Sequence, residues 1–243
     1  MRIMLPMIAL LTFAACDKQQ DDNNKVNDST ELPVPEPVPE PVPEPDTTEL
    51  WVDLGLPSGR LWASCNVGAC RPEEFGGYFA WGELAVKEYY DFSTYRHCHG
   101  DHTSLVKYCN NPAYGYDGYT DTLTVLQSED DIASIVYGES SRIPTVQDWQ
   151  ELHCCTSISP VYRGGVQGYL FTGSNGNSIF LPFSGLRYEN WQHGNTGHIA
   201  YYWSSSLCEE APHSAWAFYM PTCDKGILTQ WNRSTGCTVR AVR

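Results

Sequence analysis

Basic side chains are scarce in this sequence. Lysine and arginine together number 15 against 29 aspartates and glutamates, and the formal net charge is −14. Residues 17–50 contribute −8, residues 51–243 contribute −7, and Arg2 adds one positive charge. An acidic chain without a basic stripe argues against nucleic acid and against anionic membrane surfaces as partners.

Long apolar runs are absent after residue 15, so no later segment is predicted to cross a membrane. The first fifteen residues combine a positive start at Arg2, an apolar core over residues 3–13 and the small-residue ending Ala14-Ala15-Cys16. This pattern resembles a bacterial lipoprotein signal peptide (1–15), in which Cys16 becomes the lipidated first residue. An ordinary signal peptide and a buried N-terminal helix are the alternatives.

Large apolar side chains are almost missing from residues 16–50. Residues 17–50 hold ten acids and two lysines, which cannot build a core and predict disorder. Within them, "PVPEPVPEPVPEP" (33–45) favours a polyproline II rod of roughly 40 Å. We interpret 16–50 as an acidic, Pro-rich tether that lifts a domain off its anchor; the alternative is a ligand for a proline-binding partner.

Recognisable catalytic signatures are also lacking. Serine-hydrolase, phosphate-loop and dinucleotide-binding motifs do not occur. A nucleophilic pair of Cys155 with His153 has no orienting partner visible in the sequence. We therefore expect neither an enzyme nor a bound cofactor.

Residues 51–243 read as short strands, many turns and two helices, which predicts a compact α+β domain. Ser128 with Asp131 and Thr145 with Asp148 are helix starts, and Asn175-Gly176 is a hairpin turn. The expected apolar face of the first helix consists of Ile132, Ile135 and Val136, and this helix is expected to end at Gly138. The expected apolar face of the second helix consists of Val146, Trp149 and Leu152. Strands are expected at 61–67, 78–81, 201–205, 215–220 and 238–243, whereas 208–237 follows no period for long.

Cysteine and histidine cluster in places that suggest cross-links or metal. Ten cysteines fit an exported protein, and without Cys16 nine remain. Cys98 and Cys109 are a candidate disulfide across a loop; Cys154 or Cys155 is a candidate partner for Cys65 or Cys70, with the connectivity open. His97, His99 and His102 in "HCHGDH" are possible zinc or copper ligands, but their spacing matches no closed zinc motif and favours a solvated loop, so we predict no metal site.

Many ordered motifs of residues 51–243 resemble one family. They are "WVDLGLPSGRLWASCNVGA", "PEEFGGYFAWGE", "KYC", "EDDIAS", "RIPTVQDWQEL", "GNSIFLPFSG", "YWSSS" and "VRAVR". Together they look like the Fibrobacter succinogenes major paralogous domain of surface lipoproteins in Bacteroidetes-type bacteria. The resemblance implies a compact, loop-rich C-type-lectin-like fold, related to formylglycine-generating enzymes, with terminal strands close together. It also implies an outer-membrane, lipid-anchored protein at the cell surface.

The region 201–243 further resembles the variable region of target proteins of diversity-generating retroelements, in which asparagine codons are converted into varied residues. Only Asn232 is left between "YWSSS" and the terminal segment. The framework that the resemblance implies is Tyr202, Trp203, Ser204, Ser205, Gly236, Val239 and Arg240. The implied ligand contacts are Glu209, His213, Tyr219, Asp224, Lys225, Gln230, Trp231, Ser234 and Thr235. A fixed ligand loop or plain drift is the alternative.

The expected function is therefore adhesion or other ligand binding through 201–243. Trp231 and Tyr219 are the expected hot spots, either as a stacking platform for a glycan or as anchors for a protein. A structural surface or fimbrial component without a dedicated ligand is one alternative. A formylglycine-generating oxidase that uses two of Cys208, Cys223 and Cys237 is the other, although the residues around them do not match that enzyme.

Overall fold

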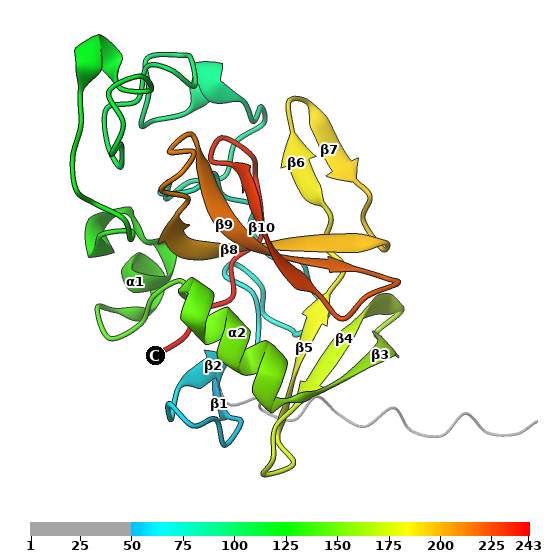
Figure 1. Ribbon diagram of the computed structural model, residues 1–243. Coiled ribbons are helices and arrows are strands. Elements are labelled where there is room, and N and C mark those ends of the chain that lie inside the picture. The colour runs from blue at the N-terminus through cyan, green and yellow to red at the C-terminus, as the bar shows by residue number, and fades with distance from the viewer. Residues whose placement is uncertain (1–49) are drawn as a thin grey trace, which may run out of the picture. The chain divides into compact units, whose positions relative to one another are not determined.

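The computed structural model of the protein describes residues 50–243, and for residues 191–194 it describes the backbone alone. The predicted signal peptide, Cys16 and the predicted tether as far as residue 49 lie outside the described residues. The described chain is a mixed helix and strand domain with few helices, as expected for the α+β class (Figure 1). Its helices and strands are β1 (Trp51–Asp53), β2 (Leu61–Ala63), α1 (Ile132–Tyr137), α2 (Val146–Cys155), β3 (Ser157–Arg163), β4 (Val166–Thr172), β5 (Ser178–Pro182), β6 (Leu186–Tyr188), β7 (Trp191–Gly194), β8 (Ile199–Leu207), β9 (Ser214–Pro221) and β10 (Ile227–Asn232), with 3-10 turns at Phe92–Thr94, Tyr116–Gly118 and Ser128–Asp130.

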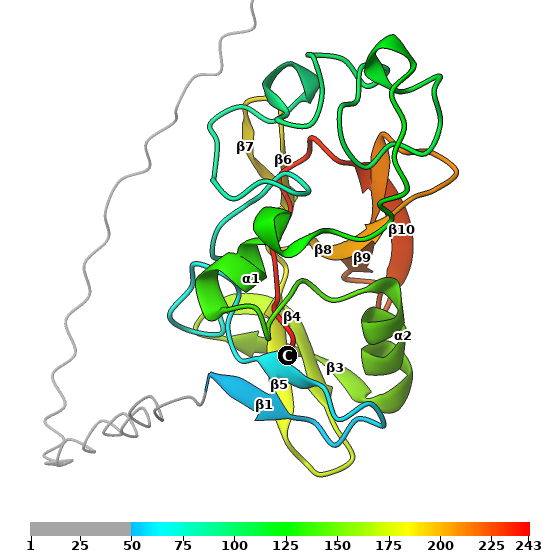
Figure 2. The same ribbon diagram turned by 90° about the vertical axis from the view of Figure 1, so that its left-hand side faces the viewer.

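Antiparallel pairing organises these strands into four small sheets. Their strand orders are β1-β2, β3-β4-β5, β6-β7 and β10-β9-β8. Helix α2 packs against the β8–β10 sheet, as Figures 1 and 2 show from two directions. Residues 64–131 form mainly loops and turns, and their backbone is held by hydrogen bonds to segments far away in the chain.

The predicted start of α2 is confirmed, whereas the predicted start of α1 is wrong in its cap: Ser128 lies in the preceding 3-10 turn, and Asp131 is the N-cap. The Thr145 hydroxyl accepts from the Asp148 amide at 3.3 Å and the Asp148 carboxylate accepts from the Thr145 amide at 2.7 Å, which completes the expected capping box. Trp149 and Leu152 of α2 are buried. At α1, Asp131 accepts hydrogen bonds from two amides of the first turn.

The predicted apolar face of α1 is wrong in its second turn. Ile132 is buried, but Ile135 is 56% exposed and Val136 is 50% exposed. The reason is the shortness of the helix, which has six residues and ends at Gly138 with a φ of 91°. Only its first turn therefore packs into the core.

The predicted hairpin around Asn175-Gly176 is confirmed as β4 and β5. Phe171, Ile179 and Leu181 lie in the core, and Gly176 has a φ of 86°, a conformation that favours glycine. The Asn175 side chain donates to the Asp53 carbonyl oxygen at 2.9 Å. The turn is thereby tied to the start of the domain.

Residues 238–243 do not form the strand that was predicted. They make isolated bridges to several segments, and Ala241 and Arg243 accept backbone hydrogen bonds from Ala63 and Leu61. Every residue from 238 to 242 is buried, so the expected contrast between two faces is absent. This extended segment runs through the core and brings the two ends of the described domain side by side.

Other strand predictions need correction as well. The expected strand 61–67 ends at Ala63, and Cys65 and Val67 continue it as buried loop. The expected strand 78–81 is a single bridge between Phe79 and Cys237. Conversely, Ile227–Asn232 forms β10 inside the stretch that had no clear period. Its β-branched and aromatic residues after Gly226 were the available signal.

All nine cysteines of the described residues are free thiols, so the predicted disulfide between Cys98 and Cys109 is wrong. The Cys98 thiol donates to the Phe92 carbonyl oxygen at 3.1 Å, and the Cys109 thiol donates to that of Asn111 at 3.2 Å. Each sulfur thus has a local partner in its own loop. The pairing of Cys154 or Cys155 with Cys65 or Cys70 is likewise not formed.

Candidate functional site

The sheet β10-β9-β8 has two different faces. Residues opposite one another in an antiparallel pair point to the same side, which places Tyr201, Tyr219 and Trp231 together. On the reverse face, Phe218 is buried and its ring stacks on Trp149 of α2 at 4.9 Å with an interplanar angle of 5°. Helix α2 therefore covers one face, and the other face packs into a core cluster with Tyr219 and Trp231 as its partly buried members.

The aromatic cluster is a compact stack centred on Tyr201. Its ring lies 4.7 Å from Tyr219 and 4.6 Å from Trp231, at interplanar angles of 28° and 34°. Tyr201 is buried, which raises its pKa and keeps the phenol neutral, whereas the two outer rings are half-buried. Tyr219 and Trp231, both predicted contacts, are thus brought together and held rigidly.

A hollow of about 270 Å³ lies at β10 beside this stack. Gln230 and Trp231, two predicted contacts, line it together with Ser214 and Asn232, which sequence reasoning did not include. Ser214 and Asn232 are opposite one another in the β9–β10 register. Their amide, hydroxyl and indole groups supply hydrogen-bond donors and acceptors beside an apolar ring.

Asp224 and Lys225 occupy the turn that joins β9 to β10. Both are exposed. Gly226 follows them with a φ of 112°, and a Cβ there would lie 2.5 Å from the Phe218 ring. The turn therefore requires this glycine, while the two charged side chains ahead of it are free to vary.

Glu209 and His213 lie at the opposite end of the hairpin, in loop 208–213. Glu209 is exposed, and its carbonyl oxygen accepts from the Asn110 side chain at 3.0 Å. His213 stacks on Tyr114 at 5.1 Å and lies 5.5 Å from His102, measured between ring centroids. Since β9 has eight residues, roughly 25 Å separates the two ends of the surface.

Ser234 and Thr235 are the two predicted contacts that the structure removes from the surface. Their exposed fractions are 1% and 0%, so the prediction that they contact a ligand is wrong. They follow Arg233, which is itself fully buried and draws this segment into the core. The predicted framework residues behave as expected, because all of them are buried: Tyr202, Trp203, Ser204, Ser205, Gly236, Val239 and Arg240.

The histidines of "HCHGDH" point to separate neighbours. His97 is buried, with Nε2 2.9 Å from the Gly82 carbonyl oxygen, and burial lowers its pKa. His99 lies on Tyr116, and His102 faces Phe92 and His213. Among residues 50–243, no three histidine, cysteine or acidic side chains are grouped closely enough to hold a metal ion.

Comparison with protein-family models, with curated proteins and with solved structures finds no match to this chain. Within the described residues, no helix combines the length and the apolar character needed to span a membrane.

We predict that His213 makes stability pH-dependent. Burial lowers its pKa, and His102 and Arg233 lower it further; its Nδ1 is buried without a hydrogen-bond partner. A lowered folded-state pKa means that folding favours the neutral imidazole. The contribution of His213 to the free energy of unfolding is therefore fully present above about pH 6.5 and is lost as the pH falls through the pKa of the folded state. Urea unfolding between pH 5 and pH 8 measures this slope.

His213→Phe keeps the ring stack on Tyr114 and removes the titration, so we expect a flatter pH profile of the unfolding free energy. The buried His97 leaves a residual slope in this variant, because its pKa is lowered too. His99→Phe is the control and should retain the full slope. An unchanged slope in His213→Phe would contradict the assignment.

Proposed function

We propose that the protein is a lipid-anchored surface protein that binds a glycan or protein ligand through the β9–β10 hairpin and loop 208–213. The observation that carries this proposal is the stack of Tyr219 and Trp231 on the buried Tyr201, next to the polar hollow at β10. Half-buried rings that already stack on a buried neighbour lose little entropy on binding. Trp and Tyr in such positions are the residue types that most often dominate binding energy.

The length of the surface bears on the kind of ligand. The predicted contacts that remain exposed extend over roughly 25 Å, which exceeds a single sugar ring and approaches the dimensions of an interface of about 800 Å² per partner. The hollow beside Trp231 is small and suits one inserted side chain or one sugar ring. A protein or an extended glycan therefore fits better than a monosaccharide.

We further propose that the domain has a C-type-lectin-like fold and that its C-terminal region is diversified. Support comes from the separation of roles in the chain: Glu209, Asp224, Lys225 and Gln230 are exposed, while the implied framework is buried. Exposed substitutions away from caps and special turns usually change stability by less than about 0.5 kcal/mol. Such positions tolerate variation, and buried ones do not.

Binding is favoured over the two alternatives by particular observations. Burial raises the pKa of Cys208 and Cys237 and keeps both as thiols, which opposes their use as a reactive oxidase pair. A purely structural component does not need partly accessible aromatic side chains beside a polar hollow. Ligand binding through these side chains is therefore the function to test.

We expect Trp231→Ala and Tyr219→Ala to weaken binding of a ligand found by screening glycan and protein libraries. Loss of an anchor of this kind costs about 2 kcal/mol or more, which is roughly a 30-fold rise in Kd. Tyr162→Ala is the matched control, since Tyr162 lies on β3 and is 74% exposed. Wild-type affinity in both variants, measured on protein with an unchanged unfolding transition, would place the site elsewhere.

Diversification predicts two elements in the DNA beside the gene. They are a reverse-transcriptase gene and a near-copy of the 3′ end that differs only at adenines. Reading the flanking DNA checks this directly. If both elements are missing, the diversification proposal fails and a fixed binding surface stands.

The anchor is tested by Cys16→Ser. We expect the variant to leave the membrane fraction, because a serine cannot take the thioether-linked lipid. Cell fractionation followed by immunoblotting measures the change, and a substitution at Cys223, an exposed thiol of the head, serves as control. Unchanged membrane association of Cys16→Ser would refute lipid anchoring at this residue.

A further inference from the structure

A second hollow is lined in part by Arg187 of β6 and shares no lining residue with the hollow at β10. Its volume is about 250 Å³, below the range of roughly 300–1,000 Å³ that is typical of drug-sized ligands. Gly76 and Gly77 form one wall without side chains, and Lys87, Tyr90 and Arg187 contribute polar groups to the rest. A site of this size suits one small functional group with part of the molecule that carries it.

Arg187 is the unusual member of this hollow. Its guanidinium lies 4.4 Å from the Tyr78 ring centroid, and its Nε is buried with no hydrogen-bond partner. No described carboxylate forms an ion pair with it. The fully buried Arg233 and Arg240, by contrast, donate to several oxygens each. Arg187 as a whole is half-buried, and because an unsatisfied buried donor is costly, its Nε–H calls for an acceptor from outside the chain.

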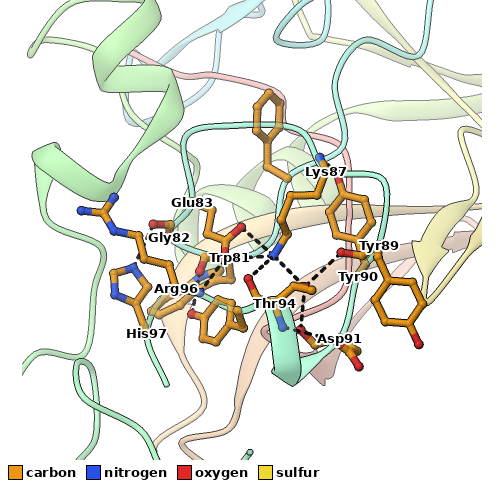
Figure 3. A network of polar contacts seen from close by, with 12 residues as sticks. Trp81, Gly82, Glu83, Lys87, Tyr89, Tyr90, Asp91, Thr94, Arg96 and His97 are labelled. Carbon is orange, nitrogen blue, oxygen red and sulfur yellow. Dashed lines mark hydrogen bonds and ion pairs between the residues drawn. The ribbon is translucent and has the colours of Figure 1, made fainter. Parts of the chain in front are cut away.

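The side chains of Lys87 and Tyr90 do not supply that acceptor, and the Tyr78 hydroxyl beside Arg187 already donates to the Ser184 carbonyl oxygen. Lys87 is held by Glu83 at 2.8 Å and by the Thr94 carbonyl oxygen at 3.1 Å, as Figure 3 shows. The Tyr90 hydroxyl accepts from the Lys87 amide and donates to the Tyr78 carbonyl oxygen at 2.6 Å. The Lys87 and Glu83 charges cancel, so Arg187 leaves the hollow with one uncompensated positive charge.

The position of Arg187 is fixed by its backbone. Arg187 and Gly236 exchange two backbone hydrogen bonds of 2.8 Å each. A Cβ on Gly236 would lie 2.7 Å from the Tyr90 ring, so glycine is required for this close packing. The guanidinium is therefore presented by a rigid strand, which reduces the entropy lost when a ligand binds.

We propose that this hollow binds the carboxylate of a small ligand through Arg187. The planar guanidinium matches a carboxylate with two parallel N–H···O bonds, and the hollow of about 250 Å³ has room for part of the body of the ligand. The site binds a negative charge, which the acidic chain as a whole repels. Binding here therefore depends on the local geometry around Arg187. The site is separate from the surface of the proposed function and does not rest on it.

The test uses glucuronate and glucose, which share a sugar ring and differ in the carboxylate. We follow the Nε–H resonance of Arg187 and the backbone amide of Gly77 by NMR during titration of the purified chain. Glucuronate should cause a saturable shift in the millimolar range, and glucose should cause none. Equal shifts with both sugars, no saturable shift with glucuronate, or tighter binding of inorganic phosphate would overturn the proposal.

Variants locate the effect at one side chain. Arg187→Gln should weaken glucuronate binding, read at the Gly77 amide, about tenfold or more, as expected for loss of a charged hydrogen-bond donor. Arg187→Lys keeps the charge without the forked geometry and should bind more weakly than the wild type but more tightly than Arg187→Gln. It also covers the case in which Arg187→Gln does not fold.

Two further variants are controls. Arg96→Gln removes an exposed arginine that does not line the hollow, and it should bind as the wild type does. Tyr162→Ala removes an exposed side chain of β3 that lies in neither hollow, and it should also bind glucuronate normally. Normal glucuronate binding in Arg187→Gln would refute the assignment to Arg187.

Discussion

The domain depends on one buried guanidinium, that of Arg233. It donates to the Tyr95 hydroxyl at 2.9 Å and to three carbonyl oxygens, those of Lys107, Tyr108 and Pro212, at 2.8–3.0 Å. It also lies 4.9 Å from the centroid of the Trp81 ring. A buried charge without a carboxylate partner is tolerated only when all its donors form hydrogen bonds. The loops that carry these four oxygens are therefore fixed in position around Arg233. Loop 208–213, one end of the proposed binding surface, is held in part by this side chain through the Pro212 carbonyl oxygen.

Arg240 plays the corresponding part near the C-terminus. Its guanidinium donates to the Asn66 side chain and to the carbonyl oxygens of Ala63 and Phe180 at 2.8–3.0 Å, and burial lowers its pKa. It joins the end of β2, the β5 strand and the terminal segment. The two arginines replace regular sheet hydrogen bonds in a domain with short strands, which explains how so much loop is ordered.

This arrangement separates stability from recognition. The β9–β10 hairpin has one face against α2, where Phe218 stacks on Trp149, and carries Tyr219 and Trp231 on the other. The turn at Asp224 and Lys225 projects from it, while Ser234 and Thr235 return to the core beside Arg233. Variation in the turn therefore leaves the core contacts in place. The hollow at Arg187 belongs to the rigid part, because β6 is bonded to Gly236.

Local sequence patterns were sufficient for features whose partners are a few residues apart. Thr145 with Asp148 and the Asn175-Gly176 turn could be read directly, because their hydrogen bonds and backbone angles are decided within the segment. The α+β class followed from such elements. The mix of aromatic and polar residues after Tyr201 likewise indicated Tyr219 and Trp231 as binding candidates, whereas their stacking on Tyr201 depends on the registers of β8 with β9 and of β9 with β10.

Tertiary structure alone decided the rest. Ser234 and Thr235 are polar and were predicted to lie at the surface. Arg233, however, donates to the carbonyl oxygens of Tyr108 and Lys107, more than a hundred residues earlier, and its burial places Ser234 and Thr235 in the core. Residues 238–243 alternate as a half-buried strand should, yet long-range bridges cover both of their sides. The lack of a hydrogen-bond partner for the Nε of Arg187 also could not be predicted from the sequence, because it depends on the positions of all segments that surround this side chain. Burial is a property of the assembled chain, and a short pattern carries information on only one side of each contact.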